Sequence, residues 1–145
     1  MKRLALVTTL LALTAGAVVA QVDIIKSRQQ IMKGVGKATG ELGKVMKGEA
    51  AFDLKQAQAA FATYADAGKK MPGLFPDTTK TGADTGALPK IWEAKADFEA
   101  KFAKLAADAE ALGPTIKDEA SFKAAFMAVT KNCGGCHELY RAKVN

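Results

Sequence analysis

The chain has 145 residues, 49% of them hydrophobic and 25% charged, and its formal net charge is +6. This length allows one domain with one substantial core. The basic residues are spread along the sequence and are not interleaved with aromatic residues in a patch, which argues against a nucleic-acid partner.

The first twenty residues have the parts of a secretory signal peptide. Lys2 and Arg3 form a basic start, and the uncharged run over residues 4–20 ends in small residues. This run reaches the lower edge of the length that spans a bilayer, so a membrane anchor is the alternative. The small residues favour cleavage after Ala20. We therefore expect an exported, periplasmic protein whose mature domain, residues 21–145, carries a net charge of +4 and does not span the membrane.

The first two helices are predicted over residues 23–48 and 53–68. In both, apolar residues recur three or four positions apart, which is the period of one helix face. Asp23 and Asp53 are the expected N-terminal caps, and Gly48 is the expected stop of the first helix.

The next stretch, residues 70–88, contains prolines and glycines without a helical period, which predicts a long loop. Two further helices are predicted over residues 89–112 and 118–142, and Pro89 suits the first turn of the earlier one. No alternating apolar run predicts a strand. We therefore expect an all-α fold, an up-down-up-down antiparallel four-helix bundle.

The fourth helix contains a recognisable cofactor motif near its end. Cys133, Gly134, Gly135, Cys136 and His137 form the pattern of covalent haem attachment. Residues three apart share a helix face, so both thiols can form thioethers on one side of a porphyrin, with His137 as iron ligand. A zinc site would need more ligands, a thioredoxin-type pair would need a neighbouring strand, and a disulfide would leave His137 without a role. We expect one haem c, with its iron, per chain.

The second axial ligand of the iron has several candidates because His137 is the only histidine. They are Met32, Met46, Met71, Met127 or no residue at all. In an up-down-up-down bundle the first and fourth helices are antiparallel neighbours, which brings Met32 nearly level with His137. Met46 then falls at the opposite end, and Met127 lies on the helix of His137 itself. Met32 is the expected ligand, and Met71 remains the alternative.

Three further features near this site each have two interpretations. Gly36, Gly40 and Gly43 lie on the helix face of the candidate methionine, and each costs about 1 kcal/mol relative to alanine. The stripe fits either a haem close to the backbone or a tight helix or dimer contact. Arg28 is a candidate partner for a haem propionate or a solvated charge. Trp92 is a candidate haem contact or an ordinary core residue.

These residues resemble the class II cytochromes c, the family that includes cytochrome c prime. The likeness extends over essentially the whole mature chain. It lies in Arg28-Gln29 with Met32, Lys47-Gly48-Glu49 before Phe52-Asp53, Leu74-Phe75-Pro76, Pro89-Lys90-Ile91-Trp92, Cys133 to His137, and Tyr140-Arg141. The resemblance implies a haem near the C-terminal end of the fourth helix, His137 as its proximal ligand and Met32 over its distal face.

The family implies two functions. One branch leaves the iron five-coordinate and binds nitric oxide or carbon monoxide, whereas the other ligates the iron through methionine and carries electrons. Met32 followed by Lys33 looks like the second branch. We expect a periplasmic one-electron carrier, with periplasmic or membrane-bound redox proteins as partners and a monomer or homodimer as its assembly. The alternative is a gas-binding cytochrome c prime. An enzyme is not expected, because there is no distal histidine to act as acid and base.

Overall fold

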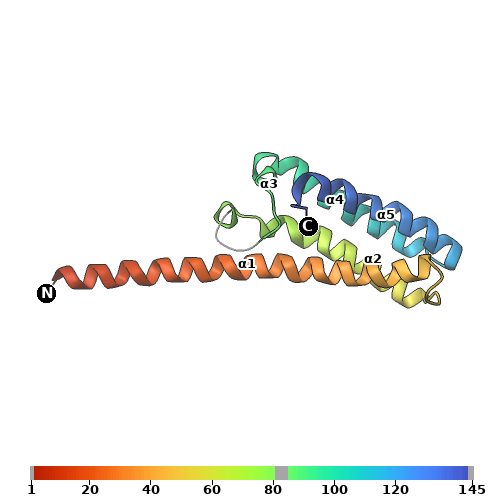
Figure 1. The fold of residues 1–145 in the computed structure, drawn as a ribbon, viewed down its shortest axis with the longest axis horizontal. Coiled ribbons are helices and arrows are strands. Elements are labelled where there is room, and N and C mark those ends of the chain that lie inside the picture. Colours follow the sequence, from red (N-terminus) through yellow and green to blue (C-terminus); the bar gives the residue numbers. More distant parts are fainter. Residues whose placement is uncertain (1, 81–84, 144–145) are drawn as a thin grey trace.

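The computed structural model describes residues 2–80 and 85–143, with side chains from residue 21 onward. Its elements in chain order are α1 (Lys2–Met46), α2 (Leu54–Lys70), η1 (Met71–Leu74), η2 (Asp77–Thr79), α3 (Lys90–Glu93), α4 (Lys95–Leu112), η3 (Gly113–Thr115) and α5 (Glu119–Tyr140). The long helices α1, α2, α4 and α5 lie side by side as a bundle, which confirms the expected all-α fold (Figure 1).

The first helix is longer than predicted. Asp23 lies inside α1 and its carbonyl accepts a hydrogen bond from the Ser27 side chain at 2.9 Å, so the prediction of Asp23 as a cap is wrong. The apolar residues before Asp23 are as compatible with a helix as those after it, so α1 does not begin at Asp23. The N-terminal part of α1 extends beyond the bundle (Figure 1). The predicted signal peptide, residues 1–20, lies outside the residues whose side chains are described.

None of the helices, over the described residues, is long and apolar enough to cross a membrane.

The other end of α1 follows the prediction. Gly48 has φ +76°, a left-handed conformation that glycine adopts without strain. The Gly48 N–H donates to the Val45 carbonyl at 3.0 Å, and the Glu49 N–H donates to the Lys44 carbonyl at 2.8 Å. This pair of bonds is a Schellman motif, which satisfies carbonyls left free at the helix end.

Aspartates begin the second and last helices. The Asp53 carboxylate accepts the Gln56 N–H at 2.8 Å, and α2 starts at the next residue. The Asp118 carboxylate accepts the Ser121 N–H at 2.8 Å, while the Ser121 hydroxyl accepts the Asp118 N–H at 3.1 Å. This reciprocal arrangement is a capping box, and it explains why α5 starts where the sequence predicted.

The stretch over residues 70–88 is more ordered than a long loop. The short helices η1 and η2 lie in it, and Met71, Phe75 and Thr79 are buried. Its last described residues pair with the chain that follows α5 through an isolated antiparallel bridge between Ala87 and Arg141. Apolar residues and local hydrogen bonds fix this segment against the bundle, although no period in the sequence reveals them.

The predicted third helix, residues 89–112, is divided in two. Ala94 has φ −123° and ψ 47°, which separates α3 from α4. Both Ile91 and Trp92 of α3 pack against the core, so tertiary contacts direct this turn away from the axis of α4.

The core holds α2 and α4 close together. A Cβ at Gly68 would lie 2.8 Å from Ala106 and from the backbone of Phe102, so only glycine permits this approach. Aromatic side chains fill the space between the helices, and Phe61 and Phe122 are among the largest fully buried residues.

Candidate haem-binding site

The C-terminal end of α5 carries the two cysteines and the histidine. Cys133 and Cys136 are free and partly buried, and burial raises the pKa of both thiols. Partial burial of His137, assisted by the positive charge of Arg141, lowers the pKa of its imidazole. The imidazole is therefore neutral near pH 7, which is the form that binds a metal. The described residues hold no cluster of three or more His, Cys, Asp or Glu able to bind a metal ion directly.

The helices that carry His137 and Met32 are antiparallel. In Figure 1, α5 ends near the part of α1 that enters the bundle. Within the described chain, α1 packs chiefly on α2, and α5 packs on α4, whereas α1 and α5 do not pack closely on each other. Met32 is partly buried and packs against the edge of the core. The helices are antiparallel as expected, but they are not the close neighbours that the sequence predicted, so the two candidate iron ligands lie on helices that have no extensive direct contact.

The glycines of α1 make no close contact inside the chain. A Cβ at Gly36, Gly40 or Gly43 would meet no heavy atom within 4 Å, and the same holds at Gly134 and Gly135 of α5. Tight packing between helices of this chain therefore does not explain the stripe. A flat cofactor against the backbone, or contact with a second chain, remains as its explanation.

The other methionines are occupied elsewhere or exposed. Met127 is 56% exposed on α5, and Met71 is 3% exposed within the core. Met46 is the last residue of α1, far from the entry of α1 into the bundle. The burial of Met71 argues against Met71 as the second iron ligand, the alternative that the sequence left open, because its side chain is already packed in the core.

Arg28 is a buried cation with one group unsatisfied. Its side chain is 4% exposed, so the interpretation of a solvated charge is wrong. Its Nη1 donates to the Leu74 carbonyl at 3.3 Å and to the Thr79 hydroxyl at 3.1 Å, and its guanidinium lies 4.3 Å from the centre of the Phe75 ring. Its Nη2 is buried without a partner. Burial lowers the pKa of this guanidinium.

These features test whether the site suits a haem. A buried donor without a partner is costly, and a carboxylate would satisfy the free Nη2 of Arg28 with a charge-assisted bond. A haem supplies two propionate carboxylates. The free thiols, the neutral imidazole and the uncovered glycines of α1 also suit a flat, covalently attached macrocycle. The residues present therefore fit the group.

Trp92 fixes the segment that Arg28 also holds. Its indole N–H donates to the carbonyls of Phe75 and Pro76 at 3.2 Å and 3.3 Å. Its ring meets the Phe75 ring edge-on, with centroids 6.1 Å apart. The observed role of Trp92 is to anchor this segment, and a contact with haem stays a prediction.

Two tyrosines near the site are buried, and neither was among the site residues expected from the sequence. Tyr64 is 2% exposed, its hydroxyl lies 3.1 Å from that of Thr39, and burial raises its pKa to about 12, with Cys133 adding to the rise. Tyr140 is 4% exposed and donates to Asp97 at 2.5 Å, a bond that raises its pKa to about 12. Both tyrosines occur among the apolar positions of predicted helices, where a buried hydroxyl needs a hydrogen-bond partner. This was the signal available in the sequence.

Comparison with known proteins agrees with this geometry. The family model described as Cytochrome C′ matches residues 23–141. The chain is 51% identical to cytochrome c′ of Rhodopseudomonas palustris, with 97% of each chain covered. It is 36% identical to cytochrome c-556 of the same organism, with 99% of each covered. The solved structure of cytochrome c′ from Rhodopseudomonas palustris has a TM-score of 0.82 at 52% identity, over 85% of this chain and 98% of that one. The chain therefore belongs to the cytochrome c′ family: it is a haem protein with covalently attached haem c, and not an enzyme.

Proposed function

We propose that the protein is a one-electron carrier of the periplasm. Cys133 and Cys136 hold the haem through thioethers, His137 is the proximal iron ligand, and Met32 is the distal one. The observation that carries the proposal is the position of Met32. It lies partly buried beside an uncovered glycine face of α1, and α1 runs antiparallel to the helix of His137.

The ligand set determines the chemistry of the haem. Iron ligated by histidine and methionine favours its reduced state, because the thioether raises the reduction potential. With both axial positions taken by side chains, an external ligand must displace one of them. Arg28 and Trp92 would support this arrangement: Arg28 would supply its free Nη2 to a propionate, and Trp92 holds the segment that encloses Arg28.

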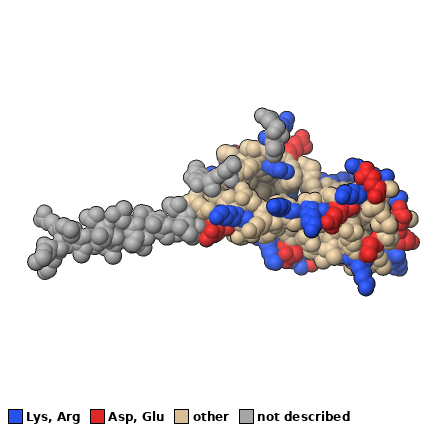
Figure 2. All heavy atoms as spheres, turned by 60° about the horizontal axis from the view of Figure 1, so that its bottom comes forward, with Lys and Arg blue, Asp and Glu red and all other residues tan. Residues whose placement is uncertain are grey.

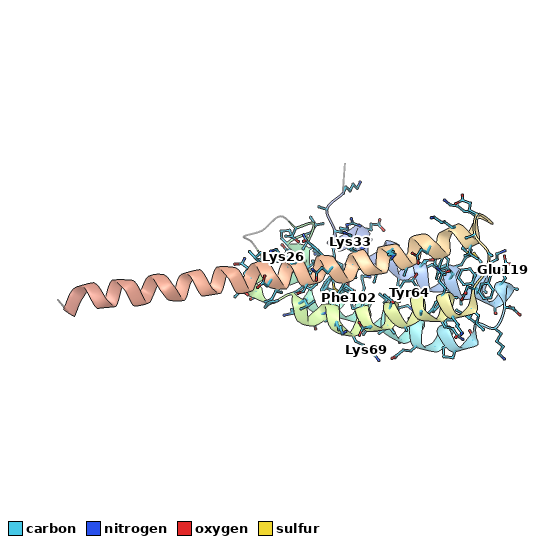
Figure 3. All side chains as sticks on the ribbon, turned by 90° about the horizontal axis from the view of Figure 1, so that it is seen from below. Lys26, Lys33, Tyr64, Lys69, Phe102 and Glu119 are labelled. Atoms are coloured by element: carbon cyan, nitrogen blue, oxygen red, sulfur yellow. The ribbon has the colours of Figure 1, made fainter. Side chains whose placement is uncertain are left out.

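The charges around the proposed haem end suit an acidic redox partner. Lys26 and Lys33 of α1 and Arg141 after α5 are exposed, and none forms an ion pair with the described residues. Figure 3 shows Lys26 and Lys33 on the same stretch of α1. Figure 2 shows basic side chains, with acidic ones among them, at the end of the body where the described side chains of α1 begin. Such a surface steers an acidic partner toward the haem edge.

Export is part of the same proposal. The basic start and apolar run before Ala20 predict cleavage by a signal peptidase. Edman sequencing of the protein from a periplasmic fraction should begin at Gln21. A first residue of Met1 in haem-loaded protein would contradict it.

The visible spectrum of the oxidised and reduced protein, with and without carbon monoxide, tests the proposed ligation. A low-spin spectrum that carbon monoxide leaves unchanged supports an iron ligated by His137 and Met32. A high-spin spectrum that shifts with the gas contradicts it.

That second outcome would favour gas binding as the function. One observation supports this candidate: the chain is similar to a protein named cytochrome c′ as well as to proteins named cytochrome c-556. In this case Met32 covers the iron without bonding to it, and nitric oxide or carbon monoxide becomes the ligand.

A further inference from the structure

A pair of hydroxyl groups joins α1 to α2 inside the bundle. Tyr64 Oη lies 3.1 Å from Thr39 Oγ1, and Thr39 Oγ1 lies 2.8 Å from the carbonyl oxygen of Val35. A threonine hydroxyl has one proton and a carbonyl oxygen only accepts, so Thr39 donates to Val35 and accepts from Tyr64. Tyr64 is therefore the donor in the bond that connects the two helices.

The hydrogen bond from Tyr64 to Thr39 is partly buried between α1 and α2. Tyr64 lies on the inner side of α2, toward α1 (Figure 3), and its side chain is 2% exposed. Cys133 of α5 is close enough to add to the rise in the pKa of Tyr64. Thr39 lies about two helical turns after Met32 on α1, so the bond holds the part of the helix that carries the proposed distal ligand. Because burial raises this pKa to about 12, Tyr64 remains a donor at neutral pH.

The buried apolar residues of α1, among them Ile25, Val35 and Leu42, oppose rotation of the helix about its axis, but the glycine face beside Met32 adds no contact to them. Gly36, Gly40 and Gly43 offer no side chain there, and a Cβ at each would meet no heavy atom within 4 Å. Rotation of α1 by even part of a turn would move Met32 sideways, because side-chain direction follows the helix angle.

Two polar anchors remain on this part of α1. Arg28 is bonded to Leu74 and Thr79, and Thr39 is bonded to Tyr64. Met32 lies between them in sequence, four residues after Arg28 and seven before Thr39, and these spacings place all three on one helix face. Arg28 and Thr39 therefore hold α1 on either side of Met32, the proposed iron ligand.

We propose that the hydrogen bond from Tyr64 to Thr39 is a positioning contact that holds Met32 toward the haem iron and so limits binding of an external ligand. The inference deepens the proposed function and rests on its placement of Met32 over the haem. It assigns Tyr64 a role through Thr39 and α1, without contact between Tyr64 and the iron.

The test uses the haem-loaded protein and two conservative variants. Tyr64→Phe keeps the ring but removes the donor, and Thr39→Val keeps the shape but removes the acceptor. Loss of one buried hydrogen bond should raise the affinity of the ferrous iron for carbon monoxide about fivefold in either variant. Each should also contain more high-spin iron than the wild type. The double variant should show no more than the larger single effect, because both changes remove the same bond.

Two control variants separate this role from general effects of substitution. Thr39→Ser retains the hydroxyl and should behave as the wild type. Thr63→Val removes a hydroxyl that donates only to the Ala59 carbonyl of its own helix, at 2.9 Å, and should leave the carbon monoxide affinity unchanged.

The outcomes distinguish this inference from the proposed function. Unchanged carbon monoxide affinity in Tyr64→Phe and Thr39→Val would overturn it, even if both variants unfold at lower temperature. A high-spin wild type would overturn ligation by Met32 and yet leave the inference testable, since Met32 then shields the iron and its displacement still raises gas affinity. A low-spin wild type with unaltered variants would overturn the inference alone.

Discussion

Arg28 of α1 donates a hydrogen bond of 3.1 Å to the hydroxyl of Thr79, 51 residues further along the chain. The two residues are 4% and 0% exposed. The Thr79 hydroxyl donates its own hydrogen bond to the Pro76 carbonyl at 2.9 Å, so its oxygen is free to accept the bond from Arg28. The pair joins the helix of the proposed distal ligand to the segment between α2 and α3.

Replacement of Arg28 tests this connection. Arg28→Met keeps an apolar stem against Phe75 but removes both hydrogen bonds to the segment. We expect the free energy of unfolding to fall by about 2 kcal/mol, the scale of hydrogen bonds from a charged donor. Urea unfolding followed by circular dichroism measures the change. Lys26→Met, at an exposed site on the same helix, is the matched control and should change stability little. Equal stability of the two variants would contradict the anchoring role.

Acid should weaken the cap of α5 in a defined pH range. Hydrogen bonds from Ser121, first through its side chain and then through its backbone N–H, lower the pKa of Asp118 below its ordinary value. The folded-state pKa lies below the unfolded one, so the stabilisation is present above the unfolded value of about 3.9 and is lost as the pH falls through the folded value. Asp118→Ala should therefore lower the melting temperature at pH 7, and the difference from the wild type should shrink below about pH 4. A difference that is constant from pH 7 to pH 3 would contradict this.

The helices and the attachment motif were predictable because local rules determine them. Asp53 caps one helix as expected, Gly48 ends another, and Cys133 and His137 lie at fixed spacing on the last. Non-local contacts were not predictable. The bridge between residues 87 and 141, the burial of Arg28 and the bond from Tyr64 to Thr39 each join residues that no local period relates.

Removal of both cysteines should abolish covalent attachment of the haem. Neither thioether can form in Cys133→Ala/Cys136→Ala, so acid–acetone should extract the haem completely. Each single variant keeps one thiol and should retain some haem after the same treatment. Met127→Ala, at an exposed position on the same helix, controls for effects of substitution in α5. Haem that survives extraction from the double variant would refute the assignment.

Met32→Ala should convert a low-spin iron to a high-spin one. The alanine offers no sulfur, so one axial position is left without a protein ligand and carbon monoxide should bind readily. The reduction potential should also fall, because the thioether stabilises reduced iron. Visible spectra and a redox titration measure both effects. Met46→Ala, at the last residue of α1, should leave the spectrum unchanged. An unaltered spectrum for Met32→Ala would assign the distal position to another residue.

Reversal of two lysine charges should alter how the haem exchanges electrons with charged reagents. We expect Lys26→Glu/Lys33→Glu to react roughly three to ten times more slowly with ferricyanide at low ionic strength, because anions are no longer attracted to that end. The difference should largely vanish at 1 M salt, where the Debye length is about 3 Å. Stopped-flow oxidation of the reduced protein measures these rates.

The matched control is Lys47→Glu/Lys55→Glu, which changes the net charge equally at the opposite end of the bundle. Both lysines are exposed, and neither forms an ion pair with a described residue. If electrons leave through the end of the bundle near Lys26 and Lys33, this variant should be slowed much less than Lys26→Glu/Lys33→Glu, since its altered charges lie at the opposite end of the bundle. Equal slowing in both double variants would show that only net charge matters, and would remove the support for an acidic partner at this surface.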